Sequence, residues 1–436
     1  MKILLVGSGG REHAMAMKLK DGATPVQLFA APGSAALAEL GSCLELAVAD
    51  VAGITAWCRE QRPDLVIVGP EAPLVAGLGD ALRAAGVPVF GHDAGTARLE
   101  GSKAFAKDFM VRHGIPCAAS ATFQDLGAAE RAIAEWPYGF PIVLKADGLA
   151  AGKGVVLAGT QAEALETVRA FLAGQFGDAS RTVLLEQPLV GMELSLHVLV
   201  DADGSHGAFA MLPPCQDHKR IFDGDRGPNT GGMGAFGPLP FLREEDLERL
   251  RTELVEATVR GLRQDGLDAR GVLFLGVMWT QSGPQLLEYN VRFGDPETQV
   301  LMELLDEDLA TLLLEVAEGR FRRTSLAIRP GCAIAVVLAA EGYPETAKHG
   351  VAISLGATAA AKVIHAGTRK RDGVWCTDGG RVLNLVAVAA DLAAARAAVA
   401  AALPAVTWPG MQVRRDIGLR ALNHARAGRT VLDPFD

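Results

Sequence analysis

The chain opens with KILLVGSGGREHAMAMKLK (residues 2–20), in which an apolar run, a glycine turn and an amphipathic run follow one another. The apolar run predicts a strand at Lys2–Val6, and the amphipathic run predicts a helix at Arg11–Lys20. The same alternation continues to about residue 100, which is typical of a parallel, doubly wound sheet. Three further apolar runs and one amphipathic run lie at Val26–Ala30, Leu65–Val68, Val87–Phe90 and Ala72–Ala85.

The turn after the first strand carries only part of a dinucleotide-binding motif. In G-x-G-x-x-G, a third glycine would follow Gly7 and Gly9, but Glu12 stands at its position. A carboxylate there would repel a pyrophosphate at the start of the helix. The pattern therefore favours a Rossmann-like domain that binds something smaller over a nicotinamide- or flavin-dependent oxidoreductase. Arg11 and the amides of Gly9 and Gly10 are suited to holding one phosphate group.

Length and composition describe an ordinary folded protein. The 436 residues are 49% hydrophobic and 21% charged, which suggests about three domains. With 42 basic and 51 acidic side chains, the net charge of −9 disfavours nucleic acids and anionic membranes as partners. The six cysteines are scattered without metal-ligand spacing, and the N-terminus lacks the pattern of a signal peptide. We expect a cytoplasmic protein with reduced thiols, a monomer rather than an obligate oligomer.

A second glycine-rich segment, KADGLAAGKG (residues 145–154), follows the apolar run Pro141–Lys145. Lys145 and Lys153 flank small residues whose backbone amides can surround a polyphosphate. The segment is not a Walker A loop, because three residues instead of four separate its glycine from Gly152-Lys153 and no hydroxyl follows. It predicts a phosphate-binding loop of another kind.

A third segment, EYNVRFGDPE (residues 288–297), alternates polar and apolar residues. In a strand, Glu288, Asn290 and Arg292 would share one face. A carboxylate and an amide oxygen suit Mg²⁺ or Mn²⁺, which take hard oxygen ligands and bridge phosphates. Arg292 is suited to clamping a carboxylate or a phosphoryl group in transfer. Beside a phosphate loop, this pattern favours a metal–nucleotide site over an exposed polar strand.

The rest of the sequence predicts further strands and helices. We expect paired strands within 182–200, a mobile or ligand-covering loop at Gln216–Pro238, and a domain boundary at Arg320–Pro330. The remaining predicted strands are Gly271–Thr280, Gln285–Tyr289, Ala333–Ala339, Lys362–His365 and Arg381–Ala389, and the predicted helices are Lys103–His113, Glu244–Asp265, Glu297–Ala317 and Leu392–Leu403.

Together the motifs resemble one family, the phosphoribosylamine–glycine ligases of the ATP-grasp superfamily. They run in order along nearly the whole chain, and GPNTGGMGA and RFGDPETQ are the most specific of them. The matching segments are GGREHA (9–14), VGPEAPLV (68–75), LEGSKAFAKDFM (99–110), KADGLAAGKGV (145–155), QDHKR (216–220), GPNTGGMGA (227–235), EYNVRFGDPETQ (288–299), HAGT (365–368), GGRVL (379–383) and RRDIG (414–418).

The resemblance implies an α/β protein of three parts. These are a Rossmann-like N-terminal domain (1–100), an ATP-grasp domain (101–325, with a lid at about 120–190) and a small α+β C-terminal domain (326–436). It also implies an ADP-forming ligase of de novo purine biosynthesis, with ATP and Mg²⁺ or Mn²⁺ as cofactors. Its substrates would be glycine and 5-phosphoribosylamine, and a glycyl phosphate intermediate would give glycinamide ribonucleotide, ADP and phosphate.

The same resemblance implies roles for individual residues. ATP would be bound by Lys103, Lys145, Gly152, Lys153, Glu186, Leu189 and Glu193, and the metal by Glu288 and Asn290. Asp217, Lys219 and Arg292 would surround the glycine and acyl phosphate and act in catalysis. The phosphoribosylamine side of the cleft would be formed by Gly9, Gly10, Arg11, Glu12 and Glu71.

Two other functions stay open beside this one. The first is another ATP-grasp carboxylate–amine ligase, or a ribonucleotide carboxylase or formyltransferase, against which QDHKR and GPNTGGMGA speak. The second is an oxidoreductase on the N-terminal domain, which Glu12 disfavours. A non-catalytic scaffold is the least favoured alternative, because Glu288, Asn290 and the lysine-bearing loop are all intact.

Overall fold

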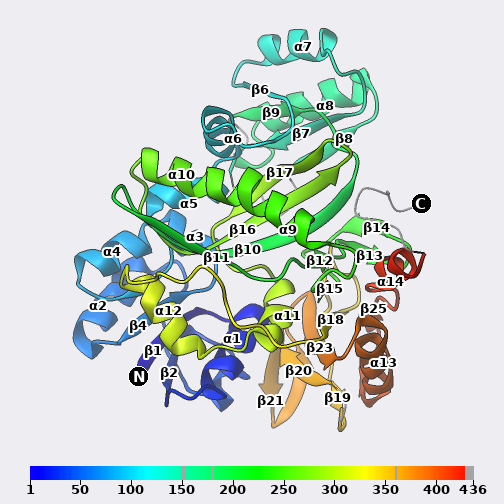
Figure 1. The fold of residues 1–436 in the computed structure, drawn as a ribbon. Helices are drawn as coiled ribbons and strands as arrows, with labels where there is room; N and C mark the ends of the chain where they lie inside the picture. The colour runs from blue at the N-terminus through cyan, green and yellow to red at the C-terminus, as the bar shows by residue number, and fades with distance from the viewer. Residues whose placement is uncertain (149–153, 178–180, 359–360, 428–436) are drawn as a thin grey trace.

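A computed structural model describes residues 1–148, 154–177, 181–358 and 361–427 of the chain (Figure 1). A parallel sheet formed by the N-terminal residues lies at one end of the molecule. Two antiparallel sheets from the middle of the chain follow, and a C-terminal sheet packs beside them. The molecule is therefore a mixed α/β structure, with these four larger sheets and three two-stranded ones among the described residues.

The N-terminal sheet has five parallel strands in the order β3-β2-β1-β4-β5. Its middle strand, β1, is fully buried from Ile3 to Val6, as expected for a strand with both faces covered by helices. The predicted doubly wound sheet is confirmed. The elements are β1 (Lys2–Gly7), α1 (Gly10–Lys20), β2 (Gln27–Pro32), β3 (Ser42–Cys43), α2 (Val51–Gln61), β4 (Leu65–Val68), α3 (Glu71–Val75), α4 (Leu78–Ala84), β5 (Val89–Phe90) and α5 (Ala94–Gly101).

Two predictions for this sheet need correction. The single helix predicted at Ala72–Ala85 is wrong, because Gly77 takes a left-handed φ of +86° and separates α3 from α4. The helix α2 was not predicted. Its start is marked in the sequence by Asp50, whose carboxylate accepts a hydrogen bond from the Gly53 amide at 2.8 Å.

The first antiparallel sheet, in the order β6-β9-β7-β8, lies at the far end from the N-terminal sheet (Figure 1). Its inner face and two helices form an apolar cluster of their own, which includes Ile133, Leu144 and Val168. This is the region predicted as a lid, and the limits of that lid stay a prediction. The elements are α6 (Lys103–Arg112), β6 (Ser120–Phe123), α7 (Leu126–Ala134), β7 (Ile142–Ala146), β8 (Val155–Ala158), α8 (Gln161–Leu172) and β9 (Val183–Glu186).

The second antiparallel sheet has the order β11-β10-β16-β17, and the predicted helix 244–265 packs against it. The hairpin predicted within 182–200 is wrong, because β9 pairs with β6 and β7 whereas β10 pairs with β11 and β16. The elements are β10 (Met192–Ala202), β11 (Gly207–Met211), α9 (Glu244–Arg249), a π-helical stretch (Leu250–Val255), α10 (Glu256–Gln264), β16 (Ala269–Thr280) and β17 (Gly283–Asn290).

The helix predicted at Glu297–Ala317 is two helices, α11 (Glu297–Leu304) and α12 (Leu309–Ala317). The break lies at Leu305, whose backbone is extended. A new helix starts after Asp308, whose carboxylate accepts a hydrogen bond from the Thr311 amide at 2.9 Å. Hydrophobic periodicity runs through both helices, so it could not reveal the break.

The C-terminal sheet has the order β12-β15-β18-β23-β20, with β25 paired to β18 as well. Two of its strands come from the middle of the chain, so the prediction of a plain loop at Gln216–Pro238 is wrong. The elements are β12 (Gln216–Asp217), β13 (Arg220–Phe222), β14 (Arg226–Asn229), β15 (Gly234–Gly237), β18 (Cys332–Ala339), β19 (Ser354–Leu355), β20 (Lys362–His365), β21 (Thr368–Arg371), β22 (Val374–Thr377), β23 (Arg381–Ala389), α13 (Leu392–Ala402), β24 (Val406–Thr407), β25 (Gln412–Val413) and α14 (Leu419–Arg426).

The cysteines and helices bear on two expectations about the environment of the protein. All six cysteines are free thiols, of which Cys43 is exposed, Cys117 is half-buried and the other four are buried. Among the helices that the structure describes, none has the length and apolar character needed to cross a bilayer. The cytoplasmic location stays a prediction.

Leu5 tests the core of the N-terminal sheet. Its side chain is fully buried at the centre of β1, so Leu5→Ala leaves a cavity and should lower the free energy of unfolding by about 3 kcal/mol. Urea denaturation followed by circular dichroism measures the change. Val388→Ala on β23 is the control: this side chain is 41% exposed, and we expect a loss below about 1 kcal/mol. Equal losses at the two positions would contradict this core.

Candidate active site

Helix α6 and the predicted phosphate loop are tied together at the end of β7. The Ser102 hydroxyl, which caps α6, donates to Asp147 Oδ2 at 3.1 Å, and the Ala104 amide donates to Asp147 Oδ1 at 3.0 Å. Lys103 Nζ donates to the Gly148 carbonyl at 2.8 Å. Burial lowers the pKa of Lys103, although the charge of Glu288 opposes this shift. The structure thus brings Lys103 to the start of the loop, and its contact with ATP stays a prediction.

Lys145 and Glu186 form a buried ion pair, with 2.6 Å between Lys145 Nζ and Glu186 Oε2. The other oxygen, Glu186 Oε1, lies 3.1 Å from the Nζ of Lys107, a residue to which the sequence analysis gave no role. Burial would raise the pKa of Glu186, but the two ammonium groups outweigh it and hold that pKa below its ordinary value. One carboxylate therefore orients two buried lysines.

The structure describes only some of the other residues that were predicted to contact the nucleotide. Gly152 and Lys153 lie outside the described residues. Leu189 is half-buried in the segment between β9 and β10. Glu193 lies on β10, and its Oε1 is 3.2 Å from Lys219 Nζ. The structure therefore brings Glu193 next to the residues predicted to act in catalysis.

Glu288 and Asn290 lie two residues apart on β17, where the Glu288 carboxylate is exposed and Asn290 is buried. Opposite Glu288, β16 carries Gly276, so no second carboxylate comes from that strand. Within the described ranges, no group of three or more histidine, cysteine, aspartate or glutamate side chains could hold a metal ion. Two oxygen donors from the protein fit a Mg²⁺ or Mn²⁺ ion that takes its other ligands from phosphates and water.

Arg292 lies in a bend just after β17, so the prediction that it continues the strand face is wrong. Its side chain nevertheless reaches Asn290: the guanidinium donates to Asn290 Oδ1 at 3.1 Å, Glu71 Oε2 at 3.0 Å and Glu100 Oε1 at 2.9 Å. Burial would lower the pKa of Arg292, but Glu100 and Glu71 outweigh it and raise that pKa. Glu100 also accepts from the Val291 amide at 2.7 Å. Arg292 is therefore a fixed, fully charged group beside the predicted metal ligands.

Asp217 and Lys219 lie on and just after β12. Asp217 Oδ2 is 3.6 Å from Lys219 Nζ, and Asp217 Oδ1 accepts from the His218 amide at 2.7 Å. Burial raises the pKa of Asp217 to about 7, although the Lys219 ammonium opposes the shift. The charge of Glu193 is the main cause that raises the pKa of Lys219. This cluster combines a stable cation with a carboxyl group that titrates near neutral pH.

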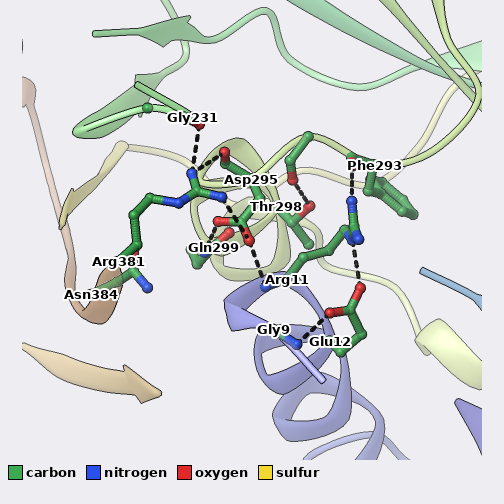
Figure 2. Close-up of polar contacts among 12 residues, drawn as sticks. Gly9, Arg11, Glu12, Gly231, Phe293, Asp295, Thr298, Gln299, Arg381 and Asn384 are labelled. Atoms are coloured by element: carbon green, nitrogen blue, oxygen red, sulfur yellow. Dashed lines mark hydrogen bonds and ion pairs between the residues drawn. The ribbon is translucent and has the colours of Figure 1, made fainter. Parts of the chain in front are cut away.

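The N-terminal glycine turn lies against the loop after β17 (Figure 2). Glu12 is buried and accepts from the Gly9 amide at 2.7 Å and from Arg11 Nε at 2.6 Å. Arg11 also donates to the Phe293 carbonyl at 3.0 Å. The Glu12 carboxylate therefore holds the turn in shape, and its predicted contact with substrate stays a prediction.

Asp295 joins three parts of the chain at this place (Figure 2). Its carboxylate accepts from Gln299 Nε2 at 2.7 Å and from the Arg11 amide at 3.4 Å. Arg381, from the C-terminal sheet, lies 3.4 Å from Asp295 Oδ2 and donates to the carbonyls of Gly231 and Asp295, each at 2.6 Å. The C-terminal part of the chain thus contacts the loop that contains Gly231 and the loop that contains Asp295.

A side chain at Gly10 would clash in this region. A Cβ there would lie 2.9 Å from Gln299 Nε2 and 3.1 Å from Asn384 Nδ2. Both amides are buried, and Gln299 Oε1 and Asn384 Oδ1 lack a hydrogen-bond partner among the described residues. The glycine is therefore needed for the close approach of α1 to α11 and β23.

Sequence reasoning missed three charged residues of the site, Lys107, Glu100 and Arg381. Lys107 follows Lys103 by four residues, a spacing that places both on one face of a helix. Glu100 and Arg381 both lie inside segments that carry the family resemblance. These signals were available, but the partners of the three residues lie far away along the chain.

The comparisons with known proteins cover nearly the whole chain. Residues 1–100, 101–298 and 333–420 match the phosphoribosylglycinamide synthetase family in its N domain, ATP-grasp (A) domain and C domain respectively. A phosphoribosylamine–glycine ligase from Mesorhizobium japonicum is 45% identical over 98% of this chain and 100% of its own length. One from Brucella melitensis is 46% identical over the same shares.

Solved structures agree in fold. The crystal structure of a phosphoribosylamine–glycine ligase from Thermotoga maritima superimposes with a TM-score of 0.83 at 32% identity, over 96% of this chain and 100% of that one. A biotin carboxylase from Campylobacter jejuni, at 16% identity, has a TM-score of 0.73 over 99% and 97% of the two chains. The predicted fold class, with its Rossmann-like, ATP-grasp and C-terminal parts, is confirmed. The chain belongs to the phosphoribosylglycinamide synthetase family, whose members are phosphoribosylamine–glycine ligases.

Proposed function

We propose that this chain uses ATP to join glycine to 5-phosphoribosylamine, giving glycinamide ribonucleotide, ADP and phosphate. The observation that carries the proposal is a likeness of about 45% identity to ligases of this name over their full lengths. The site supports it, because Lys103 and Lys145 are suited to phosphates, and the oxygen donor pair Glu288 and Asn290 lies directly before the half-buried Arg292, which contacts Asn290.

The first step transfers the γ-phosphoryl group of ATP to a carboxylate oxygen of glycine. The bond between the γ-phosphorus and the β-bridging oxygen breaks, and glycyl phosphate and ADP form. Lys103 and Lys145 bind the phosphates, while Glu288 and Asn290 hold a Mg²⁺ or Mn²⁺ ion. When bound, this ion would neutralise negative charge on the phosphates of ATP. Arg292, oriented by its hydrogen bonds to Glu71, Glu100, Asn290 and the Phe293 carbonyl, stabilises the negative charge of the reacting carboxylate.

The second step forms the amide bond. The amine of phosphoribosylamine attacks the carbonyl carbon of glycyl phosphate, the bond from that carbon to the phosphate oxygen breaks, and the departing phosphate takes up the proton that the nitrogen loses. Lys219 stabilises the departing phosphate, and Asp217 fixes the position of Lys219 through their ion pair. Gly9, Gly10, Arg11, Glu12 and Glu71 form the side of the cleft that receives phosphoribosylamine.

The domain limits that we propose are 1–100, 101–325 with a lid at about 120–190, and 326–436. The family matches to residues 1–100, 101–298 and 333–420 support this division into three. ATP would lie between the lid and the sheet that contains β17, with Glu186, Leu189 and Glu193 beside its adenosine and Gly152 and Lys153 at its phosphates.

Coupled release of ADP tests the reaction. The assay contains Mg²⁺, ATP, glycine and phosphoribosylamine generated in situ, and each component is omitted in turn. We expect ADP release to need both glycine and the amine, and to equal the glycinamide ribonucleotide formed. ADP release with a different carboxylate and amine, and none with this pair, would favour another ATP-grasp ligase and contradict the substrate assignment.

Glu288→Gln tests the metal site. The change removes the negative charge that faces the ion, so turnover should fall at least about a hundredfold at saturating Mg²⁺ while the melting temperature stays near that of the wild type. Glu341→Gln is the matched control, because Glu341 forms an exposed ion pair with Lys348 and should keep full activity. Near-normal turnover of Glu288→Gln would contradict the role of Glu288.

The pKa of Asp217 predicts an acidic limb in the pH profile. Because burial raises this pKa to about 7, protonation below that pH removes one of the two carboxylate charges, those of Glu193 and Asp217, that hold Lys219. We expect kcat/KM for glycine to fall about tenfold per unit below pH 7. Asp217→Asn should have low activity without this limb. Asp265→Asn is the control and should keep the limb, because the pKa of Asp265 lies below its ordinary value. A flat wild-type profile from pH 6 to 8 would contradict this assignment.

A further inference from the structure

Lys107 is a buried cation that the proposed reaction does not use. It lies on α6 four residues after Lys103, and its side chain is only 6% exposed. Its Nζ is 3.1 Å from Glu186 Oε1 and donates to the Ala118 carbonyl at 3.3 Å. Lys107 is therefore turned into the protein, toward the carboxylate that also orients Lys145.

Lys145 differs from Lys107 in what it leaves available. Among the described residues, the only hydrogen-bond or ion-pair partner of the Lys145 ammonium group is Glu186. An ammonium group has three N–H donors, so two remain for other partners. Lys145 also lies near the end of β7, directly before the phosphate loop. It is the lysine of this pair that can contact a ligand.

The charges of this cluster do not balance. Lys107 and Lys145 carry two positive charges, Glu186 carries one negative charge, and all three side chains are at most 10% exposed. A buried surplus of positive charge is unfavourable unless an anion is present to pair with it. Lys103, at the start of the same helix, is a further cation at the loop, but its charge is opposed by the carboxylates of Glu288, Asp147 and Glu100, so the surplus lies at Lys107 and Lys145. The cluster is therefore suited to receiving a polyanion.

We propose that Lys107 is a positioning residue for the nucleotide phosphates. It occupies one oxygen of Glu186, so that Glu186 orients Lys145 through its other oxygen without cancelling the positive charge of the cluster. This role rests on the proposed function, because it requires a nucleotide whose phosphates lie at the loop after β7.

Removal of the Lys107 charge should weaken the binding of the nucleotide phosphates and leave the binding of adenosine unchanged. In Lys107→Met, Lys145 and Glu186 form a neutral pair, and the attraction of the cluster for a polyphosphate is lost. Affinity for ADP should fall on the order of tenfold, and KM for ATP should rise by a similar factor. Binding of adenosine, which carries no phosphate, should be unchanged, and kcat should change less than about threefold.

Calorimetric titration of the full chain with Mg²⁺-ADP and with adenosine measures the two affinities, and the coupled assay gives KM and kcat. Lys107→Arg keeps the charge and should restore KM for ATP to near the wild-type value. Lys107→Gln removes the charge but can still donate to Glu186, so it gives the same test if Lys107→Met does not fold. Lys362→Met is the matched control, because it removes a lysine from the exposed Lys362–Glu303 ion pair.

Four results would overturn the proposal. Equal weakening of ADP and adenosine would show that Lys107 only supports the shape of the pocket. A lower melting temperature with unchanged ADP affinity would show a purely structural ion pair. Absence of Mg²⁺-ADP binding by the wild type would overturn the proposed nucleotide site itself, whereas binding by the wild type together with normal affinity in Lys107→Gln would overturn only the role of Lys107.

Discussion

The guanidinium of Arg292 holds together parts of the chain that are far apart in sequence. It donates to Glu71 at the start of α3, to Glu100 on α5 and to Asn290 at the end of β17. A guanidinium has five N–H donors in a fixed plane, so these acceptors also fix its orientation. The N-terminal sheet, the helix before α6 and the predicted metal pair are thereby positioned relative to one another by a single side chain.

The carboxylates around Arg292 explain why its guanidinium can lie half-buried. Two carboxylates lie within 3.0 Å of the one guanidinium, so the group is compensated before any substrate arrives. The cluster of Lys107, Lys145 and Glu186 has the opposite arrangement, with two cations for one carboxylate. The two clusters therefore differ in charge: carboxylates outnumber the cation at Arg292, whereas cations outnumber the carboxylate at Glu186.

The sequence predicted local features well and long-range ones poorly. The strands Lys362–His365 and Arg381–Ala389 have the predicted limits, because bounded apolar runs specify a buried strand directly. The hairpin within 182–200 failed because neighbouring strands in the chain need not pair in space. The break at Gly77 was missed because glycine lies inside a pattern that otherwise suits a helix.

For the site, residue types predicted the chemistry but not the partners. The pair Glu288 and Asn290 was found because alternation on a strand is visible in the sequence. Asp295 and Arg381 were not connected, since their contact depends on how the C-terminal sheet packs against the loop after β17. Lys107 was missed for the same reason, because its partner Glu186 lies on a strand that the chain reaches only much later.

The composition of the C-terminal sheet limits how this protein can change by exchange of segments. The strands β12 and β15 come from residues 216–237, yet β15 pairs with β18 along its whole length. A crossover near residue 330 between two relatives would therefore divide one sheet between two parents. Only an exchange that also includes residues 216–237 takes both strands of the β15–β18 pair from the same parent. The third domain therefore cannot be exchanged between relatives by itself without changing this pairing.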